Sequence, residues 1–154
     1  MSQKRVKILM LDDDYESMQN LKDHLEEELG WDVTLTAEKT LLERLGHERF
    51  DILLIDSMIH SKSTNSQMQA VQNIHYDNVK WDRTGLEFVR RFRKGEYSHA
   101  SRGTPSDVPI IVLSAVADSA ANGEWGKIIQ TEHHVEKPFR LFDLTNLMHR
   151  LLQE

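Results

Sequence analysis

Residues 6–14 read Val-Lys-Ile-Leu-Met-Leu-Asp-Asp-Asp, an apolar run that ends in three consecutive aspartates. Only Lys7 interrupts the run, which is typical of a short strand buried on both faces of a parallel sheet. A helix with one apolar face is predicted next, and Gly30 stands where its C-terminal cap belongs. Its apolar residues recur every three or four positions: Met18, Leu21, Leu25 and Leu29.

The alternation of strand and helix continues along the chain. Further strands are predicted at residues 33–36, 50–55 and 108–113 and around His134 and Val135. Apolar periodicity predicts helices within residues 41–45, 86–92, 117–130 and 141–152. Five strands alternating with five helices indicate an α/β fold, a (βα)5 doubly wound five-stranded parallel sheet with right-handed crossovers. Residues 1–154 are expected to form a single domain.

Composition excludes several classes of protein. The 154 residues are 39% hydrophobic and 29% charged, as in a globular domain. No stretch approaches the roughly 20 apolar residues of a membrane helix, and no signal peptide precedes the first strand, so we expect a cytoplasmic protein without membrane insertion. The chain has no cysteine, which excludes disulfides and thiolate sites. A net charge of −6 argues against direct binding of nucleic acid.

Polar residues follow the predicted strands at the points where ligands bind in a parallel sheet. Asp12 and Asp13 follow the first strand, Asp56 the third, Ser114 the fourth and Lys137 the fifth. Three carboxylates and one ammonium leave an acidic site, and its oxygen ligands suit Mg²⁺. A carboxylate can also accept a phosphoryl group, whose oxygens a metal ion, a hydroxyl and an ammonium can stabilise.

The order of these motifs resembles the receiver domain of two-component response regulators. The resemblance covers about residues 4–153 and rests on four segments: Leu-Asp12-Asp13, Asp56, Ser114-Ala115 and Lys137-Pro138-Phe139. It implies the flavodoxin-like strand order 2-1-3-4-5. It further implies a stand-alone phosphoryl-accepting signalling module rather than an enzyme. A histidine kinase or phosphotransfer protein would phosphorylate it, which would switch a face of the fourth helix, fifth strand and fifth helix toward a downstream protein.

The resemblance also assigns roles to the metal-site residues. Asp56 would be the phosphoacceptor. Asp13, Asp56 and the backbone carbonyl of Met58 would bind Mg²⁺ directly, with Asp12 acting through water and with Mn²⁺ as an alternative ion. Gly85 resembles the glycine that opens the third helix of these domains.

Further roles fall on residues that follow the later strands. Ser114 would be the switch hydroxyl, Lys137 would contact the phosphoryl group, and the bond from Lys137 to Pro138 is expected to be cis. His134 stands where similar domains carry an aromatic that moves with the hydroxyl, which makes a switch role for His134 one of two readings. The other is an ordinary solvated histidine.

Other interpretations stay open at this stage. A degenerate receiver that only binds partners would have lost an acid or the lysine, and neither is lost. An aspartyl-nucleophile phosphatase would carry a second aspartate where this chain has Met58. A flavin or nucleotide binder would need a glycine-rich phosphate loop after the first strand. Locally, Asp13 with Glu16 matches a helix capping box, and Asp14 is expected to be a capping residue.

Residues 59–84 depart from the pattern, because they form a longer connection than similar receivers have. The segment is polar, and His60 replaces the usual proline four residues after the phosphoacceptor. We expect a mobile loop inserted into the domain, anchored near Trp81 and leaning over the site. The alternatives are a passive insertion and a partner-docking element anchored by Trp81 and the pair Met68 and Val71. His60, His75 and His133 are expected to be solvated, since no pair has the spacing of a helical metal site.

Overall fold

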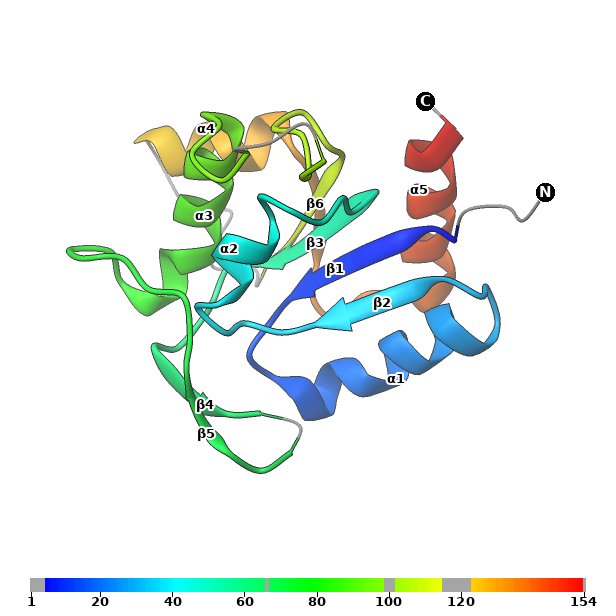
Figure 1. Cartoon of the computed structure of the whole chain (residues 1–154). Helices are drawn as coiled ribbons and strands as arrows, with labels where there is room; N and C mark the ends of the chain where they lie inside the picture. The colour runs from blue at the N-terminus through cyan, green and yellow to red at the C-terminus, as the bar shows by residue number, and fades with distance from the viewer. Residues whose placement is uncertain (1–4, 66, 99–101, 115–122, 154) are drawn as a thin grey trace.

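The strands β1 (Lys7–Leu11), β2 (Asp32–Leu35), β3 (Ile52–Asp56), β6 (Ile110–Ser114) and β7 (His133–Glu136) form one parallel sheet (Figure 1). Its order is β2-β1-β3-β6-β7, which confirms the predicted fold and strand order. The computed structural model describes residues 5–65, 67–98, 102–114 and 123–153. The remaining elements are α1 (Tyr15–Glu27), α2 (Leu41–Arg44), β4 (Lys62–Thr64), β5 (Ala70–Gln72), the 3₁₀ turn η1 (Trp81–Arg83), α3 (Thr84–Arg93), α4 (Gly123–Thr131) and α5 (Leu141–Gln153).

Two apolar cores lie on opposite faces of the sheet, because successive side chains of a strand point to opposite sides. In β1, Leu9 and Leu11 pack with α2, α3 and α4, whereas Ile8 and Met10 pack with α1 and α5. Figure 1 shows the same division, with α1 and α5 on one side and α2, α3 and α4 on the other. The near-continuous apolar strands are therefore explained by burial on both faces.

The predicted elements agree with the structure to within a few residues at most of their ends. The second strand begins at Asp32, and the fifth, β7, extends over His133–Glu136. The helix expected at 117–130 is present as α4 from Gly123, while its predicted beginning and Ala115 lie outside the described residues. At the first helix, the N-cap is Asp14, whose side chain accepts a hydrogen bond from Ser17 N at 3.2 Å. A capping box starting at Asp13 is therefore wrong.

The expectation of one long polar loop over residues 59–84 is wrong in part. Strands β4 and β5 pair as an antiparallel hairpin that extends beside the start of α1 (Figure 1). Four residues of the segment are fully or almost fully buried: Ile59, Asn73, Ile74 and Thr84. Ile74 N donates to Ala37 O at 3.0 Å, which ties the segment to the connection after β2. These few apolar and backbone contacts order part of a segment whose composition is mostly polar.

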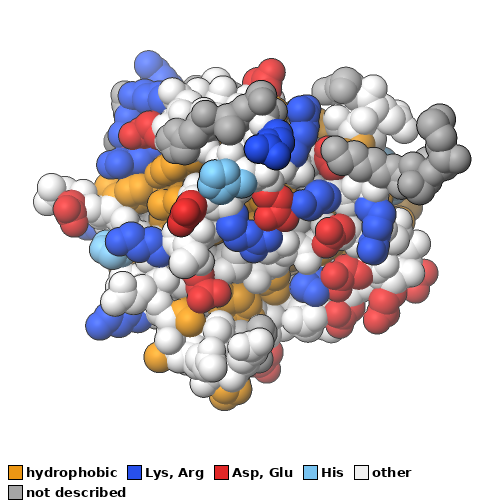
Figure 2. Space-filling view, viewed as in Figure 1, with side chains coloured by type: hydrophobic (Ala, Val, Ile, Leu, Met, Phe, Trp, Pro, Cys, Tyr) orange, Lys and Arg blue, Asp and Glu red, His pale blue; other side chains and the backbone are white. Residues whose placement is uncertain are grey.

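Charges of both signs are mixed over the surface seen in Figure 2. Lys and Arg side chains alternate there with Asp and Glu among the described residues. This face lacks the continuous basic band that tracks a nucleic-acid backbone, and the absence of nucleic-acid binding stays a prediction. Within the described ranges, no helix combines the length and apolar character that crossing a membrane requires.

Candidate functional site

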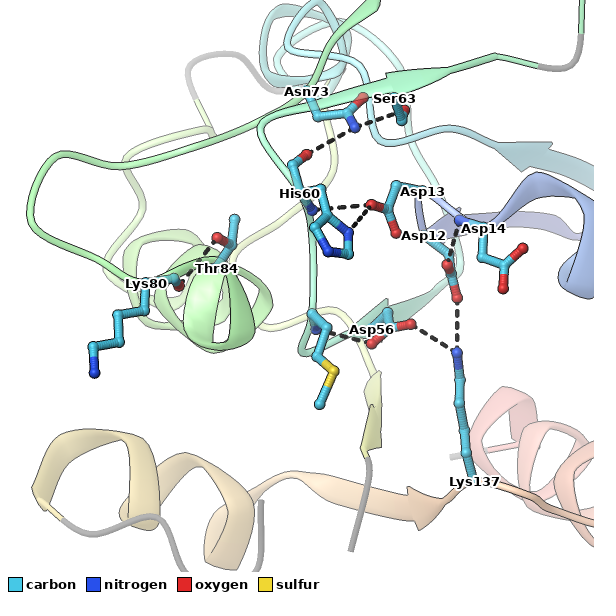
Figure 3. Close-up of polar contacts among 11 residues, drawn as sticks. Asp12, Asp13, Asp14, Asp56, His60, Ser63, Asn73, Lys80, Thr84 and Lys137 are labelled. Atoms are coloured by element: carbon cyan, nitrogen blue, oxygen red, sulfur yellow. Dashed lines mark hydrogen bonds and ion pairs between the residues drawn. The ribbon is translucent and has the colours of Figure 1, made fainter. Parts of the chain in front are cut away.

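Asp12, Asp56 and Lys137 meet at the carboxyl edge of the sheet. Asp12 directly follows β1, Asp56 ends β3 and Lys137 directly follows β7. Lys137 Nζ donates to Asp12 Oδ2 at 3.0 Å and to Asp56 Oδ2 at 2.7 Å (Figure 3). The side chain of Asp12 is 1% exposed and that of Asp56 is 11% exposed. One ammonium therefore bridges two buried carboxylates that lie 44 residues apart in the chain.

The backbone orients both of these carboxylates. Asp12 Oδ1 accepts a hydrogen bond from Asp14 N at 2.8 Å, and Asp56 Oδ1 accepts one from Met58 N at 2.9 Å. Each is a bond to the amide two residues further on, the turn that aspartate commonly makes where a strand ends. The second oxygen of each side chain is thereby directed to Lys137.

Gly85 packs against the backbone of the predicted phosphoacceptor. Gly85 N donates to Ser57 O at 3.0 Å, at the start of α3. A Cβ atom at position 85 would lie 1.8 Å from the backbone oxygen of Asp56. Only a residue without a side chain allows α3 to approach β3 this closely, which gives the glycine noted in the sequence a physical role.

Burial and neighbouring charge raise the pKa of Asp12. Removal from water is the larger cause, the negative charge of Asp56 adds to it, and Lys137 opposes both, which leaves a pKa of about 7. For Lys137, burial lowers the pKa, but the carboxylates of Asp56 and Asp12 outweigh burial and raise it. Lys137 thus stays protonated at neutral pH, whereas in the absence of a metal ion Asp12 binds a proton near neutral pH even beside Lys137.

Asp12→Asn is expected to stabilise the protein above neutral pH in metal-free buffer. Between about pH 4 and 7 the folded state holds a proton on Asp12 that the unfolded chain has lost, so the free energy of unfolding falls as pH rises. Asparagine has no proton to release, so the free energy of unfolding of the variant should not fall in this way. Its excess over the wild-type value should grow from near zero at pH 4 to about 1–4 kcal/mol at pH 8. Urea denaturation with EDTA at both pH values measures it. Exposed Asp32→Asn is the control, and parallel pH profiles for Asp12→Asn and the wild type would contradict the expectation.

Asp13 is held by a residue that the sequence did not connect with it. His60 N and His60 Nδ1 each lie 2.9 Å from Asp13 Oδ2 (Figure 3). The ring of His60 stacks on Trp81, with centroids 4.4 Å apart and planes at 17°. The expectation that His60 is merely solvated is therefore wrong, although its side chain is 59% exposed. The one sequence signal was its place four residues after Asp56.

Ser114 and His134 are also in contact. Ser114 is fully buried at the end of β6, and its Oγ is hydrogen-bonded to His134 Nε2. Ser114 O accepts a bond from Lys137 N at 2.8 Å, so the serine lies beside the lysine-bearing turn. The bond between Lys137 and Pro138 is cis. The hydroxyl and the predicted switch residue therefore form one contact, and their roles stay predictions.

His133 and His75 were expected to be solvated, and the structure agrees with this for both. His133 and His75 are exposed, and His75 Nδ1 lies 3.4 Å from Asn73 O.

In the described part of the chain, no group of three or more His, Cys, Asp or Glu side chains is spaced to hold a metal ion by itself. Mg²⁺ does not need one, because it keeps several waters and usually takes one or two carboxylates together with phosphate oxygens. The oxygen donors of Asp12, Asp13 and Asp56 therefore fit Mg²⁺.

Solved structures share this architecture. The receiver domain of a Francisella response regulator is 23% identical with a TM-score of 0.64, over 97% of this chain and 98% of its own. A CheY-like response regulator receiver domain protein from Methanospirillum hungatei JF-1 is 19% identical with a TM-score of 0.65, over 97% and 95%. This chain has the receiver-domain fold. A third receiver domain, from a sensor histidine kinase of Pseudomonas aeruginosa PAO1, is 21% identical with a TM-score of 0.60, over 98% and 100%.

That third receiver domain is described with a magnesium ion coordinated in its active-site cleft. No family model and no curated protein sequence matches this chain. Because each of the three structural comparisons covers 97% or more of this chain, none singles out residues 59–84 as an addition to the receiver fold. The description of this segment as an insertion stays a prediction.

Proposed function

We propose that the protein is a phosphoryl-accepting signalling module that is phosphorylated on Asp56 with the help of Mg²⁺. The observation that carries the proposal is the bridge from Lys137 Nζ to Asp56 and Asp12 at the carboxyl edge of a receiver-type sheet. It supplies a carboxylate nucleophile, a buried second acid and a fixed cation in one place. The donor would be a histidine kinase or a phosphotransfer protein, and the site would act in the cytoplasm.

The residues of the site divide the work of the transfer. Asp56 Oδ2, now bonded to Lys137, would attack phosphorus, and the bond between phosphorus and the donor nitrogen would break. The ammonium of Lys137 would bind an oxygen of the transferred phosphoryl group, since it already lies 2.7 Å from the attacking atom. Bound Mg²⁺, held by Asp13, Asp56 and the Met58 carbonyl and through water by Asp12, would neutralise the charge that builds up on the phosphoryl group. Ser114 would donate its hydroxyl to another phosphoryl oxygen.

The same geometry favours a switch over a hydrolase. A hydrolase needs a general acid or base beside the nucleophile to release the product, and Met58 stands at the position where aspartyl phosphatases carry one. A purely partner-binding, degenerate receiver is disfavoured because the acids and the lysine are present and in contact. We therefore infer a protein that accepts a phosphoryl group without catalysing turnover of a separate substrate.

The exposed side chains at the start of α5 support a partner-binding face beside the site. Phe142 is 74% exposed and Leu141 is 38% exposed, a few residues after Lys137. Movement of Ser114 toward a phosphoryl group would release its contact with His134 on β7, the strand that precedes α5. Phosphorylation would in this way reach a face formed by α4, β7 and α5 and change its affinity for a downstream protein.

Phosphorylation by a small donor tests the proposal directly. Incubation with acetyl phosphate and Mg²⁺ should add one phosphoryl group per chain in intact-mass spectra, and EDTA should prevent the addition. Beryllofluoride with Mg²⁺ should shift the amide NMR signals around Asp56, Ser114 and Lys137. A chain that gains no mass and shows no Mg²⁺-dependent spectral change would contradict the proposed function.

Mg²⁺ is expected to stabilise the wild-type protein against heat, and Asp13→Ala should remove most of that effect. The folded site gathers carboxylates that are scattered in the unfolded chain, so a ligand of the folded state raises its stability. At ten times the dissociation constant the gain is about 1.4 kcal/mol, which raises Tm by about 3–6 °C. Differential scanning fluorimetry measures it, with Asp14→Asn as the control. Equal Mg²⁺ shifts for Asp13→Ala and the wild type would place the metal elsewhere.

A further inference from the structure

The three acidic side chains of the site are oriented in two different ways. Asp12 and Asp56 each accept a hydrogen bond from the amide two residues later in their own turn. Asp13 instead accepts both of its hydrogen bonds from His60, which is 47 residues away in the chain. Both bonds end on Oδ2, so Oδ1 carries no protein hydrogen bond within the described part of the chain. The position of Asp13 therefore depends on the segment that carries His60.

Two neighbours, Asn73 and Trp81, hold His60 in place. Its backbone oxygen accepts a hydrogen bond from Asn73 Nδ2 at 2.9 Å, and Asn73 is fully buried. Its ring stacks on Trp81, and Ile59 N donates to Trp81 O at 2.9 Å, which joins the beginning and the end of the segment. An ionised carboxylate only accepts hydrogen bonds, so the ring nitrogen facing Asp13, Nδ1, carries the proton. These contacts hold His60 with its two donors toward Asp13, and Figure 3 shows the bonds that His60 makes with Asn73 and Asp13.

We propose that His60 is a positioning residue for Asp13, and that residues 59–84 set the Mg²⁺ affinity of the site through it. This rests on the proposed function, because it takes Asp13 as a metal ligand. With Oδ2 occupied by two donors, Asp13 presents Oδ1 to the cation in one orientation and loses little freedom on binding. Partners that orient a metal ligand commonly change metal affinity when they are removed. The stack on Trp81 keeps the imidazole in the plane that this bond requires.

Paired substitutions at His60 separate the hydrogen bond from the ring. His60→Phe keeps a ring that can stack on Trp81 but lacks the donor, whereas His60→Asn loses the ring and places an amide donor near the position of Nδ1. His75→Phe is the matched control, since His75 is an exposed histidine of the same segment that contacts Asn73 rather than Asp13. Trp81→Leu tests the stack. Because His60, His75 and Trp81 are exposed, these variants are expected to fold, and circular dichroism checks this.

Isothermal titration of Mg²⁺ at pH 8 gives the decisive measurement. His60→Phe should raise the Kd for Mg²⁺ about three- to tenfold, the backbone donor of residue 60 being retained. His60→Asn should stay within about twofold of the wild type and Trp81→Leu should lie between the two, while His75→Phe should be unchanged. With acetyl phosphate, the Mg²⁺ concentration for half-maximal phosphorylation should rise in His60→Phe while the maximal rate is preserved.

The outcomes distinguish this inference from the proposed function. If the wild type binds Mg²⁺ and is phosphorylated, but His60→Phe has the wild-type Kd, His60 does not position Asp13 and the inference alone is overturned. The same holds if His60→Asn binds as weakly as His60→Phe, because the donor would then not matter. If the wild type neither binds Mg²⁺ nor accepts a phosphoryl group, the proposed function itself fails.

Discussion

Asp56→Asn is expected to abolish phosphorylation while the chain remains folded. The amide has the shape of the carboxylate, and its oxygen can still accept the hydrogen bond from Met58 N. It is a poor nucleophile toward phosphorus, however, and it removes the negative charge that Lys137 contacts at 2.7 Å. Acetyl phosphate with Mg²⁺, followed by intact-mass analysis, should show no added phosphoryl group. The free energy of unfolding should change by less than about 2 kcal/mol, because the lost ion pair is offset by weaker repulsion with Asp12.

Asp14→Asn is the matched control for this experiment. It makes the same change from carboxylate to amide at the same edge of the sheet, and asparagine caps a helix as well as aspartate does. Because Asp14 bonds Ser17 N at the start of α1 and neither Asp56 nor Lys137, the variant should be phosphorylated like the wild type. If Asp56→Asn gained a phosphoryl group to the same extent as the wild type, Asp56 would not be the phosphoacceptor.

The sequence predicts the fold well because local patterns of apolar and polar residues determine most of its strands and helices. The strands β1, β3 and β6 are short apolar runs, and each ends at or directly before a polar residue at the ligand-binding edge. Burial on both faces of a parallel sheet explains the runs, and the crossover rule leaves few ways to connect them. The same rule brings Asp12, Asp56 and Lys137 to one edge without any information on their contacts.

The contacts of residues 59–84 could not be predicted in this way. The hairpin of β4 and β5 has three residues in each strand, too few for an alternating pattern to stand out. The bond between His60 and Asp13 depends on a chain reversal, on the buried amide of Asn73 and on the stack with Trp81. The last two are contacts between polar or aromatic residues that lie far apart in the sequence. From composition alone, such residues are expected in a solvated loop.

Gly85→Ala is expected to destabilise the protein by about 3 kcal/mol or more, a large effect for adding one methyl group. The new Cβ would lie 1.8 Å from the backbone oxygen of Asp56 and 2.8 Å from the Cα of Ser57, so a strand or a helix must move. Neither atom belongs to a flexible side chain that could turn aside. The Tm should fall by about 6–12 °C. Phosphorylation should slow as well, because the displaced backbone is the one that orients Asp56.

Gly95→Ala separates the effect of this close approach from that of losing a glycine. Gly95 follows α3 with φ +85°, and nothing lies within 4 Å of a Cβ built there. The alanine would be strained by the left-handed backbone alone, at a cost of about 1–2 kcal/mol, and its distance from the site should leave phosphorylation unchanged. Thermal melts of the two variants, together with their phosphorylation rates, compare the causes directly. If Gly85→Ala were as mild as Gly95→Ala and equally active, contact between α3 and β3 would not hold Asp56 in place.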